Sequence, residues 1–530
     1  MKKLFALLAA AAFLCSLSVR PLSADAIEAA GIDDFTQQTA EKRENTPDFD
    51  TYNETYSDGL YEFYLSEEYA CLSGCKDRTI TEAVIPAEVK GLPVIGITNS
   101  PFGFCRNLRT IVLPDTLQYF EWQALVVPSV RLGSSDTDPV PSVAEIVVSE
   151  TNPYYTVSDG LLYTKDMKTL IGCPPALGMT EVQISAQTET IGDYAFVACR
   201  DLRTAVIPEH VKHICNGAFA ACPSLTRAEL PESITLIGGD MFWICESLSE
   251  VTFRGELEKI GYGAFGRCTA LTDFTIPETV TFIGCNAFQE SGCIENVNGV
   301  HYFQNWVVGS DEDVRDAVVR EGTVGISEMA FSQANELELL DIPASAKYIC
   351  NLPVIQIGKP KSRVHYRADH IYEKTLIGAR STMDFYIWDP DCEIFDSEKT
   401  IPAEYRYDVQ VWESDDAFGV SGSLDTECGV LTTKTITGDA VIHGYEGSTA
   451  QAYAEKYNRI FVPIAEPTGD LNGDGALTVA DAVQLRKYLL GAPDAVPSDW
   501  TAADMYMDGR LDAFDLSIVK KMLLNQEGTR

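Results

Sequence analysis

The chain of 530 residues is poor in basic residues and in histidine, and it has no long apolar run beyond its first residues. It has 40 Lys and Arg residues against 78 Asp and Glu residues, which gives a formal net charge of −38 at pH 7. This charge argues against nucleic acids and anionic membranes as partners, because both are polyanions. Carboxylates in such number suit hard cations such as calcium. After the N-terminus, no stretch is long and apolar enough to predict a membrane span.

Recognisable catalytic motifs are also missing, since the sequence has no His-Glu-x-x-His and no Gly-x-Ser-x-Gly pattern. The six histidines are scattered, and His210 and His213 follow a repeated proline, where surface turns are expected. Paired carboxylates of a glycosidase cannot be recognised in so acidic a chain. The sequence therefore predicts a protein that is not an enzyme. The alternative is a degradative enzyme whose active site lies in the irregular regions 27–80 or 345–430.

The N-terminus has the pattern of a secretory signal peptide. Lys2 and Lys3 precede an apolar stretch from Leu4 to Val19, and Ala24-Asp25-Ala26 resembles a cleavage site. We expect a signal peptide over residues 1–26, an N-terminal region or cap over 27–79, and a secreted, extracellular mature protein.

A repeat of 23 residues dominates the middle of the chain. Four columns keep this step: Ile191, Ile214, Ile237, Ile260 and Ile283; Phe196, Phe219, Phe242, Phe265 and Phe288; Cys199, Cys222, Cys245 and Cys268; Leu202, Leu225, Leu248 and Leu271. An earlier copy uses Phe102, Cys105, Leu108 and Pro114, and a later one uses Ile326, Phe331, Ala334, Leu337 and Pro343. One turn cannot bury its own apolar residues, so the turns must stack. We predict an α/β leucine-rich-repeat solenoid over 80–462, with a parallel β-sheet on one face, a strand over 202–207 and an irregular insert around 345–430.

At these residues the chain resembles the BspA-like leucine-rich repeats of bacterial surface and secreted proteins. Two further blocks fit that family, the interrupting segment 152–163 and the closing segment 444–456.

The cysteines allow two interpretations. Four occupy one repeat column, where a small apolar side chain fills the core, which favours buried free thiols there. Cys71 and Cys75 lie outside that column, four residues apart, and are the better disulfide candidates.

The repeat register also predicts which strand residues point outward. They are Arg203, Thr204, Val206, Thr226, Arg227, Glu229, Ser249, Glu250, Thr252, Thr272, Asp273 and Thr275. This set is polar and lacks Trp and Tyr, so it favours a protein over a glycan as ligand, and a solvated sheet without any ligand is the alternative.

After a linker over 463–469, the chain changes character and carries an EF-hand-type loop. Oxygen ligands fall at the alternating positions 1, 3, 5, 7, 9 and 12, namely Asp470, Asn472, Asp474, the Ala476 carbonyl, Thr478 and Asp481. The pattern returns 34 residues later with Asp504, Asp508, the Arg510 carbonyl, Asp512 and Asp515. A helix is expected after each loop, over 482–490 and 516–524. Two Ca²⁺ sites are therefore predicted, the second weaker because Tyr506 stands at its position 3.

This duplicated loop–helix pair resembles a type I dockerin, a small all-α calcium-binding module, here over 470–530. The resemblance implies docking onto the cohesin of a scaffoldin in a cell-surface cellulosome, in the context of plant polysaccharide degradation. It assigns cohesin recognition to Val479, Ala480, Arg486 and Lys487 in one half and to Ala513, Phe514, Lys520 and Lys521 in the other. We thus expect a non-catalytic binding or structural subunit. The two alternatives are the degradative enzyme described above and a host- or microbe-directed adhesin. The solenoid's own ligand is left open.

Overall fold

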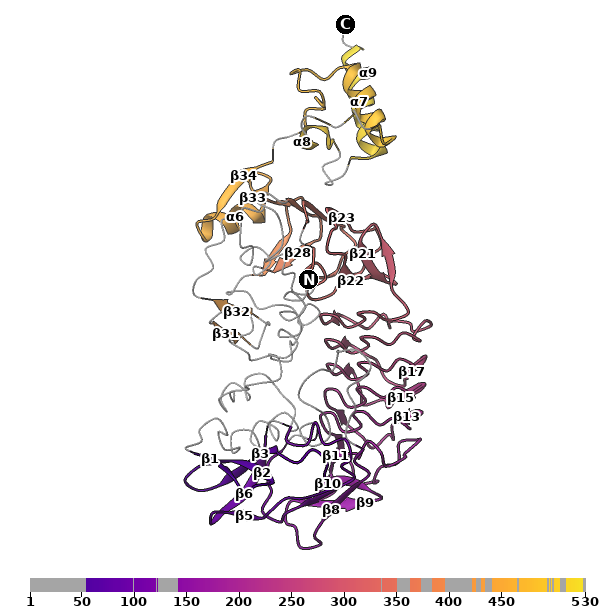
Figure 1. Cartoon of the computed structure of the whole chain (residues 1–530). Coiled ribbons are helices and arrows are strands. Elements are labelled where there is room, and N and C mark those ends of the chain that lie inside the picture. Colours follow the sequence, from indigo (N-terminus) through magenta and orange to yellow (C-terminus); the bar gives the residue numbers. More distant parts are fainter. Residues whose placement is uncertain are drawn as a thin grey trace. The chain divides into compact units, whose positions relative to one another are not determined.

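The computed structural model describes residues 54–98, 100–120, 122, 142–334, 336–349, 363–372, 384–395, 422–425, 430–433, 441–464, 467–492, 495, 497, 500–505 and 511–527 (Figure 1). The predicted signal peptide and most of the irregular insert lie outside these residues. The chain forms two compact units, residues 1–295 with 406–434, and 296–405 with 435–530. Among the described residues, no helix is both long and apolar enough to cross a membrane.

The first unit begins with short strands that close the end of the repeat array. One sheet has the order β1 (Glu54–Ser57), β2 (Tyr61–Leu65), β3 (Ala70–Cys75), β6 (Leu92–Ile97) and β5 (Glu88–Val89). A parallel sheet contains β4 (Glu82–Val84), β7 (Thr110–Leu113) and β8 (Glu145–Val148). The interrupting block forms an antiparallel hairpin of β9 (Tyr155–Ser158) and β10 (Leu161–Thr164), followed by β11 (Thr169–Gly172).

From there the chain winds as a regular solenoid with two parallel strand rows. One row is β13 (Thr204–Val206), β15 (Arg227–Leu230) and β17 (Glu250–Phe253), stacked one above another in Figure 1. The other row comprises β12 (Thr190–Ile191) and β14 (His213–Ile214), then β16 (Leu236–Ile237), β18 (Lys259–Ile260) and β19 (Phe282–Ile283). Arg227 pairs with Thr204 and with Glu250, so the strand register equals the sequence period. The predicted parallel solenoid is confirmed, and its strand at 202–207 is observed as β13.

The predicted columns form the core of these turns. The phenyl rings of Phe196, Phe219, Phe242, Phe265 and Phe288 are buried and stack in sequence, with neighbouring centroids 5.1 to 5.7 Å apart and planes within 16° of parallel. Offset stacking of this kind adds to the gain from burial alone. We call this set the phenyl ladder.

The cysteine column lies beside the phenyl ladder as buried free thiols, as predicted. Three of the four thiols donate a hydrogen bond to a phenylalanine carbonyl oxygen of the preceding turn: Cys222 to Phe196 at 3.0 Å, Cys245 to Phe219 at 3.1 Å and Cys268 to Phe242 at 3.2 Å. Cys199 donates instead to the carbonyl oxygen of Cys173 at 3.8 Å. Burial raises the pKa of the Cys245 thiol to about 12, which keeps it protonated and able to donate. The column therefore has a hydrogen-bonding role in addition to filling space.

Cys71 and Cys75, the predicted disulfide candidates, do not form a disulfide with each other. Both lie on β3 as free thiols. Four residues of extended strand separate Cα atoms by ~13 Å, well beyond the ~7 Å that a disulfide spans.

Two short strands complete the described part of the first unit, β31 (Gly422–Asp425) and β32 (Val430–Thr433), paired antiparallel.

The second unit contains further rungs of the same kind. One sheet has the order β20 (Glu295–Val297), β21 (Val300–Phe303), β22 (Trp306–Ser310), β24 (Gly325–Ile326) and β26 (Tyr348–Ile349). The other has β23 (Asp316–Val318), β25 (Leu339–Ile342), β27 (Arg363–Tyr366), β29 (Asp384–Ile387), β33 (Val441–Gly444) and β34 (Ile460–Pro463). β28 (His370–Tyr372) pairs in parallel with β30 (Glu393–Phe395), so rungs are also present within the irregular insert. The closing block forms α6 (Thr449–Lys456), capped by the Ser448 hydroxyl.

Candidate calcium-binding and docking site

The C-terminal residues form a small helical module with its own core. It contains α7 (Val479–Leu489), α8 (Trp500–Ala503) and α9 (Ala513–Glu527), and α7 packs against α9 (Figure 1). The core residues are Leu471, Ala482, Leu485, Ala503, Met505 and Val519. Both predicted helices are confirmed, and α9 begins earlier and ends later than expected. Leu477 packs against this core.

The first loop curls around its own side-chain oxygens. The Asp470 carboxylate accepts hydrogen bonds from the amides of Gly473 at 2.8 Å, Asp474 at 3.1 Å and Gly475 at 2.7 Å. Gly475 has φ +87°, a conformation that a residue with a side chain rarely adopts, so the sharp turn at position 6 requires glycine.

The next two ligand positions repeat this inward orientation. The Asn472 side-chain oxygen accepts from the Asp474 amide at 2.8 Å, and an Asp474 carboxylate oxygen accepts from the Ala476 amide at 3.0 Å. Positions 1, 3 and 5 therefore turn oxygen atoms toward the inside of the loop, where a hard cation would be bound.

Asp481 closes the loop and begins the helix at once. Its carboxylate is fully buried and accepts from the amides of Leu471 at 2.9 Å and Asn472 at 3.1 Å, and from Thr478 at 2.8 Å. Thr478 and Asp481 form a capping box at the N-terminus of α7. The same carboxylate thus connects the start of the loop to the first turn of the helix.

The second loop repeats this arrangement where it is described. The Asp512 amide donates to the Asp515 carboxylate at 2.7 Å, and the Phe514 amide donates to the Asp512 carboxylate at 2.6 Å. Asp504 and Asp515 are buried like Asp481. Tyr506, Asp508 and Arg510 lie outside the described residues.

The first loop fits a calcium ion by the chemistry of its donors. No three His, Cys, Asp or Glu side chains converge as a metal cluster within the described ranges. An EF-hand-type loop does not need one, because an amide oxygen, a backbone carbonyl and water complete its shell. Here Asn472 and the Ala476 carbonyl hold those positions beside the carboxylates of Asp470 and Asp474.

All eight predicted recognition residues are exposed: Val479, Ala480, Arg486, Lys487, Ala513, Phe514, Lys520 and Lys521. Three exposed apolar residues extend this set and were missed from the sequence, Val483, Leu490 and Leu524, with 48%, 74% and 69% of their surface accessible. The helical spacing from Val479 could have revealed Val483 and Leu490, since residues at i, i+4 and i+11 share a face. Leu490 and Leu524 correspond across the 34-residue repeat, whereas Val483 corresponds to the polar Ser517.

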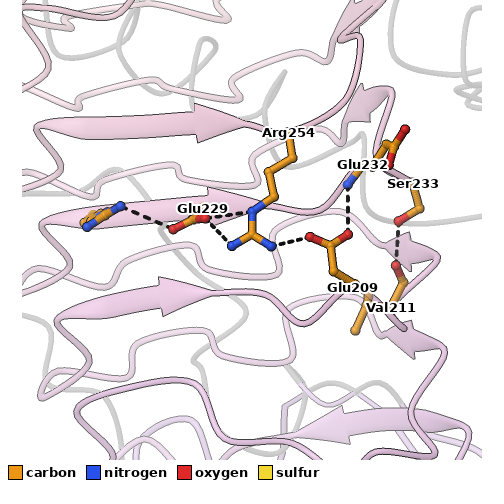
Figure 2. Close-up of polar contacts among 7 residues, drawn as sticks. Glu209, Val211, Glu229, Glu232, Ser233 and Arg254 are labelled. Carbon is orange, nitrogen blue, oxygen red and sulfur yellow. Dashed lines mark hydrogen bonds and ion pairs between the residues drawn. The ribbon is translucent and has the colours of Figure 1, made fainter.

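The solenoid carries a second candidate surface, the outward side of β13, β15 and β17. The residues predicted to point outward there are exposed or half-buried. Arg254 pairs with both Glu229 and Glu209 (Figure 2). Arg227 also pairs with Glu229, at 3.2 Å. Charged residues of consecutive turns therefore bind one another across this face.

In the second unit the corresponding strand positions carry different residues. His365, Tyr386 and His443 stand side by side on β27, β29 and β33, with His365 buried and the other two half-buried. The rings of Tyr386 and His443 stack at 4.2 Å with planes 11° apart. The polar composition inferred from the regular repeats therefore does not extend to these rungs. The alternation of core and non-core residues along β29, Asp384-Phe385-Tyr386-Ile387, could have predicted this strand from the sequence. It falls in the irregular insert, where the repeat register is lost.

Comparison with known proteins gives two family matches. Residues 176–295 match the BspA type leucine rich repeat region in six copies, and residues 468–524 match the dockerin type I domain. No match is found among curated proteins.

Solved structures give matches of low identity. A leucine rich cell surface protein from Faecalibacterium prausnitzii A2-165 is 24% identical, with 66% of this chain and 86% of that one covered and a TM-score of 0.25. A leucine-rich repeat protein from Bacteroides ovatus ATCC 8483 is 15% identical, with 78% and 99% covered and a TM-score of 0.29.

Proposed function

We propose that this chain, which combines BspA-type leucine-rich repeats with a type I dockerin domain, is a non-catalytic binding subunit docked by calcium onto cohesins of a cellulosome-type scaffold. The observation that carries the proposal is the duplicated loop–helix unit, in which both ligand loops lead directly into exposed helix faces. We also propose that the protein is exported from the cell and is associated with polysaccharide degradation.

Calcium acts in this proposal by ordering the loops. In the first loop the ligands are Asp470, Asn472, Asp474, the Ala476 carbonyl, Thr478 and Asp481. In the second they are Asp504, Asp508, the Arg510 carbonyl, Asp512 and Asp515, which gives two sites. The cation offsets the mutual repulsion of the carboxylates, and the loop then holds its helix at a fixed angle.

The docking surface is the pair of exposed helix faces. Each combines apolar side chains at the helix start with two basic residues further along, Arg486 with Lys487 on α7 and Lys520 with Lys521 on α9. Apolar contacts supply affinity, and the basic pairs favour a partner that presents acidic groups. The halves differ at Val483 and Ser517, so we expect one half to bind more tightly than the other.

The solenoid supplies a second binding function in this proposal. Its outward face on β13 to β17 is polar and carries charges of both signs, a composition that suits a protein ligand.

Binding of the full chain to immobilised type I cohesins, measured by surface plasmon resonance, tests the docking role. We expect binding in millimolar calcium and none after chelation. Replacing Arg486 and Lys487 by Glu should weaken binding at least tenfold if α7 is the preferred half, and the equivalent change at Lys520 and Lys521 should do so if α9 is. The matched control is Lys165→Glu with Lys168→Glu, an equal charge change on the solenoid. Calcium-independent binding, or no effect of either pair, would overturn the proposal.

A further inference from the structure

Two thiols lie side by side at the N-terminal end of the repeat array. Cys75 ends β3, and Cys105 occupies the cysteine position of the earliest repeat copy. Their sulfur atoms both approach the backbone carbonyl oxygen of Asp77, at 3.4 Å from Cys75 and 3.9 Å from Cys105. Residues 30 positions apart in the chain thus place their sulfur atoms beside the same carbonyl group.

The surroundings make one of these sulfur atoms accessible and the other not. Cys105 is buried, whereas Cys75 is half-buried. By contrast, the thiols of Cys222, Cys245 and Cys268 are fully buried and hydrogen-bonded to carbonyl groups of the preceding turn. A reagent in solution can therefore reach Cys75 in the folded protein but not the thiols of the cysteine column.

We propose that Cys75 and Cys105 form a disulfide bond by exchange with a small-molecule disulfide such as oxidised glutathione. The Cys75 thiolate attacks one sulfur of the reagent, which releases one glutathione thiolate and leaves a mixed disulfide on Cys75. The Cys105 thiolate then attacks the Cys75 sulfur, forms the protein disulfide and expels the second glutathione. The protein loses two protons and two electrons, and the reagent gains them as two thiols.

This bond would link the sheet formed by β1, β2, β3, β6 and β5 to the repeat array. β3 is a central strand of that sheet, and its neighbour β2 already contacts the first repeat, where the rings of Tyr61 and Phe102 meet edge to face at 6.3 Å. A covalent link across the same contact restricts the unfolded chain and opposes opening of this end of the solenoid. Terminal turns of a solenoid have a neighbour on one side only, so such a link acts where fraying begins.

Peptide mapping of the full chain tests the proposal. The reduced protein is incubated with oxidised glutathione, its remaining thiols are alkylated after denaturation, and it is digested without reduction for mass spectrometry. No Lys or Arg lies between Cys71 and Cys75, so trypsin leaves both on one peptide. The Cys71→Ser variant removes this ambiguity, and we expect it to yield a peptide linking Cys75 to Cys105. Because burial raises the pKa of the Cys75 thiol, the link should form faster at pH 9 than at pH 7.

The Cys105→Ser variant supplies the matched control. It should stop at the glutathione adduct of Cys75, and its unfolding temperature should lose the reductant-dependent shift of several degrees that we expect for the unmodified sequence. Recovery of Cys105 as an alkylated thiol after oxidation of the Cys71→Ser variant would overturn the proposal. So would a link from either cysteine to a different residue.

Discussion

The regular turns around the phenyl ladder and the C-terminal docking module bury very different chemistry. In the turns, five stacked phenylalanines and the cysteine column fill an interior that is apolar and repeats from turn to turn. The core cluster of the described part of the docking module has six buried apolar residues, and three carboxylates are also buried there, Asp481, Asp504 and Asp515. Burying apolar area stabilises a fold without any ligand, whereas burying carboxylates is costly unless donors or a cation surround them. One region is therefore complete in itself, and the other is suited to control by a metal ion.

Removing calcium should produce the largest difference in stability between the two regions. With a calcium chelator present, we expect the backbone amides of α7 and α9 to lose protection from hydrogen exchange, because metal binding and folding are coupled in small metal-binding modules. Amides of residues 191–288 should keep theirs. Equal exchange of both regions with and without calcium would show that the docking module folds without the ion.

Cutting the phenyl ladder should be the largest effect of a single substitution. Phe242→Ala removes a fully buried ring that stacks on both neighbours, and we expect the free energy of unfolding to fall by about 3–5 kcal/mol. Denaturant unfolding followed by tryptophan fluorescence would measure it, since Trp243 is adjacent. Phe104→Ala is the control, because that ring is 53% exposed and should cost less than ~1 kcal/mol. Similar losses for both variants would refute the ladder as the source of stability.

A pH effect should come from Asp240 in the same turns. Burial raises the pKa of this carboxyl from its ordinary value of 3.8 to about 7, while the Tyr262 hydroxyl donates to it. The folded state therefore holds the proton more tightly than the unfolded state does. Its stabilising contribution is complete below pH ~4 and falls by up to ~1.4 kcal/mol per pH unit until pH ~7.

Asp240→Asn should remove this dependence and raise stability at pH 7. The substitution keeps a polar side chain for Tyr262, and Asn tolerates the φ of +52° at this position. Thermal unfolding of both forms would be measured between pH 4 and pH 8. Plotted against pH, their unfolding temperatures should converge at low pH. Parallel curves across this range would contradict the assignment.

The smallest effect should come from the outward charges. Arg254 is exposed and pairs with Glu209 and Glu229, so Arg254→Ala should cost less than ~1 kcal/mol and cost still less at high salt. A larger loss would mean that the polar face contributes to folding as well as to ligand contact.

The regular part of the fold could be predicted because the repeat places the same residue type at the same structural position in each turn. Phe, Cys and Leu at a constant step fix which side chains share a column, so the parallel strands and buried thiols follow directly. The EF-hand-type loop is similarly readable, because the ligand chemistry dictates both residue type and spacing.

Backbone conformations that side chains do not encode could not be predicted. Ala198, Ala221, Ile244 and Arg267, each next to a column cysteine, all adopt φ near +60° although none is glycine. In this turn the amides of Tyr194, Phe196 and Ala198 donate to carbonyl oxygens of the next turn, at 2.7 to 2.9 Å. These inter-turn bonds offset the local strain, and they exist only once neighbouring turns are stacked. The approach of Cys75 and Cys105 to the same Asp77 carbonyl group likewise depends on how the sheet that contains β3 packs, which no local pattern specifies.

A calorimetric titration of calcium into the chelated full chain, followed by a type I cohesin, tests whether docking depends on calcium. We expect a saturable heat of calcium binding that Asp470→Ala with Asp474→Ala reduces, and cohesin binding only after that step. Cohesin binding at full strength before calcium is added, or no calcium heat at all, would contradict this expectation.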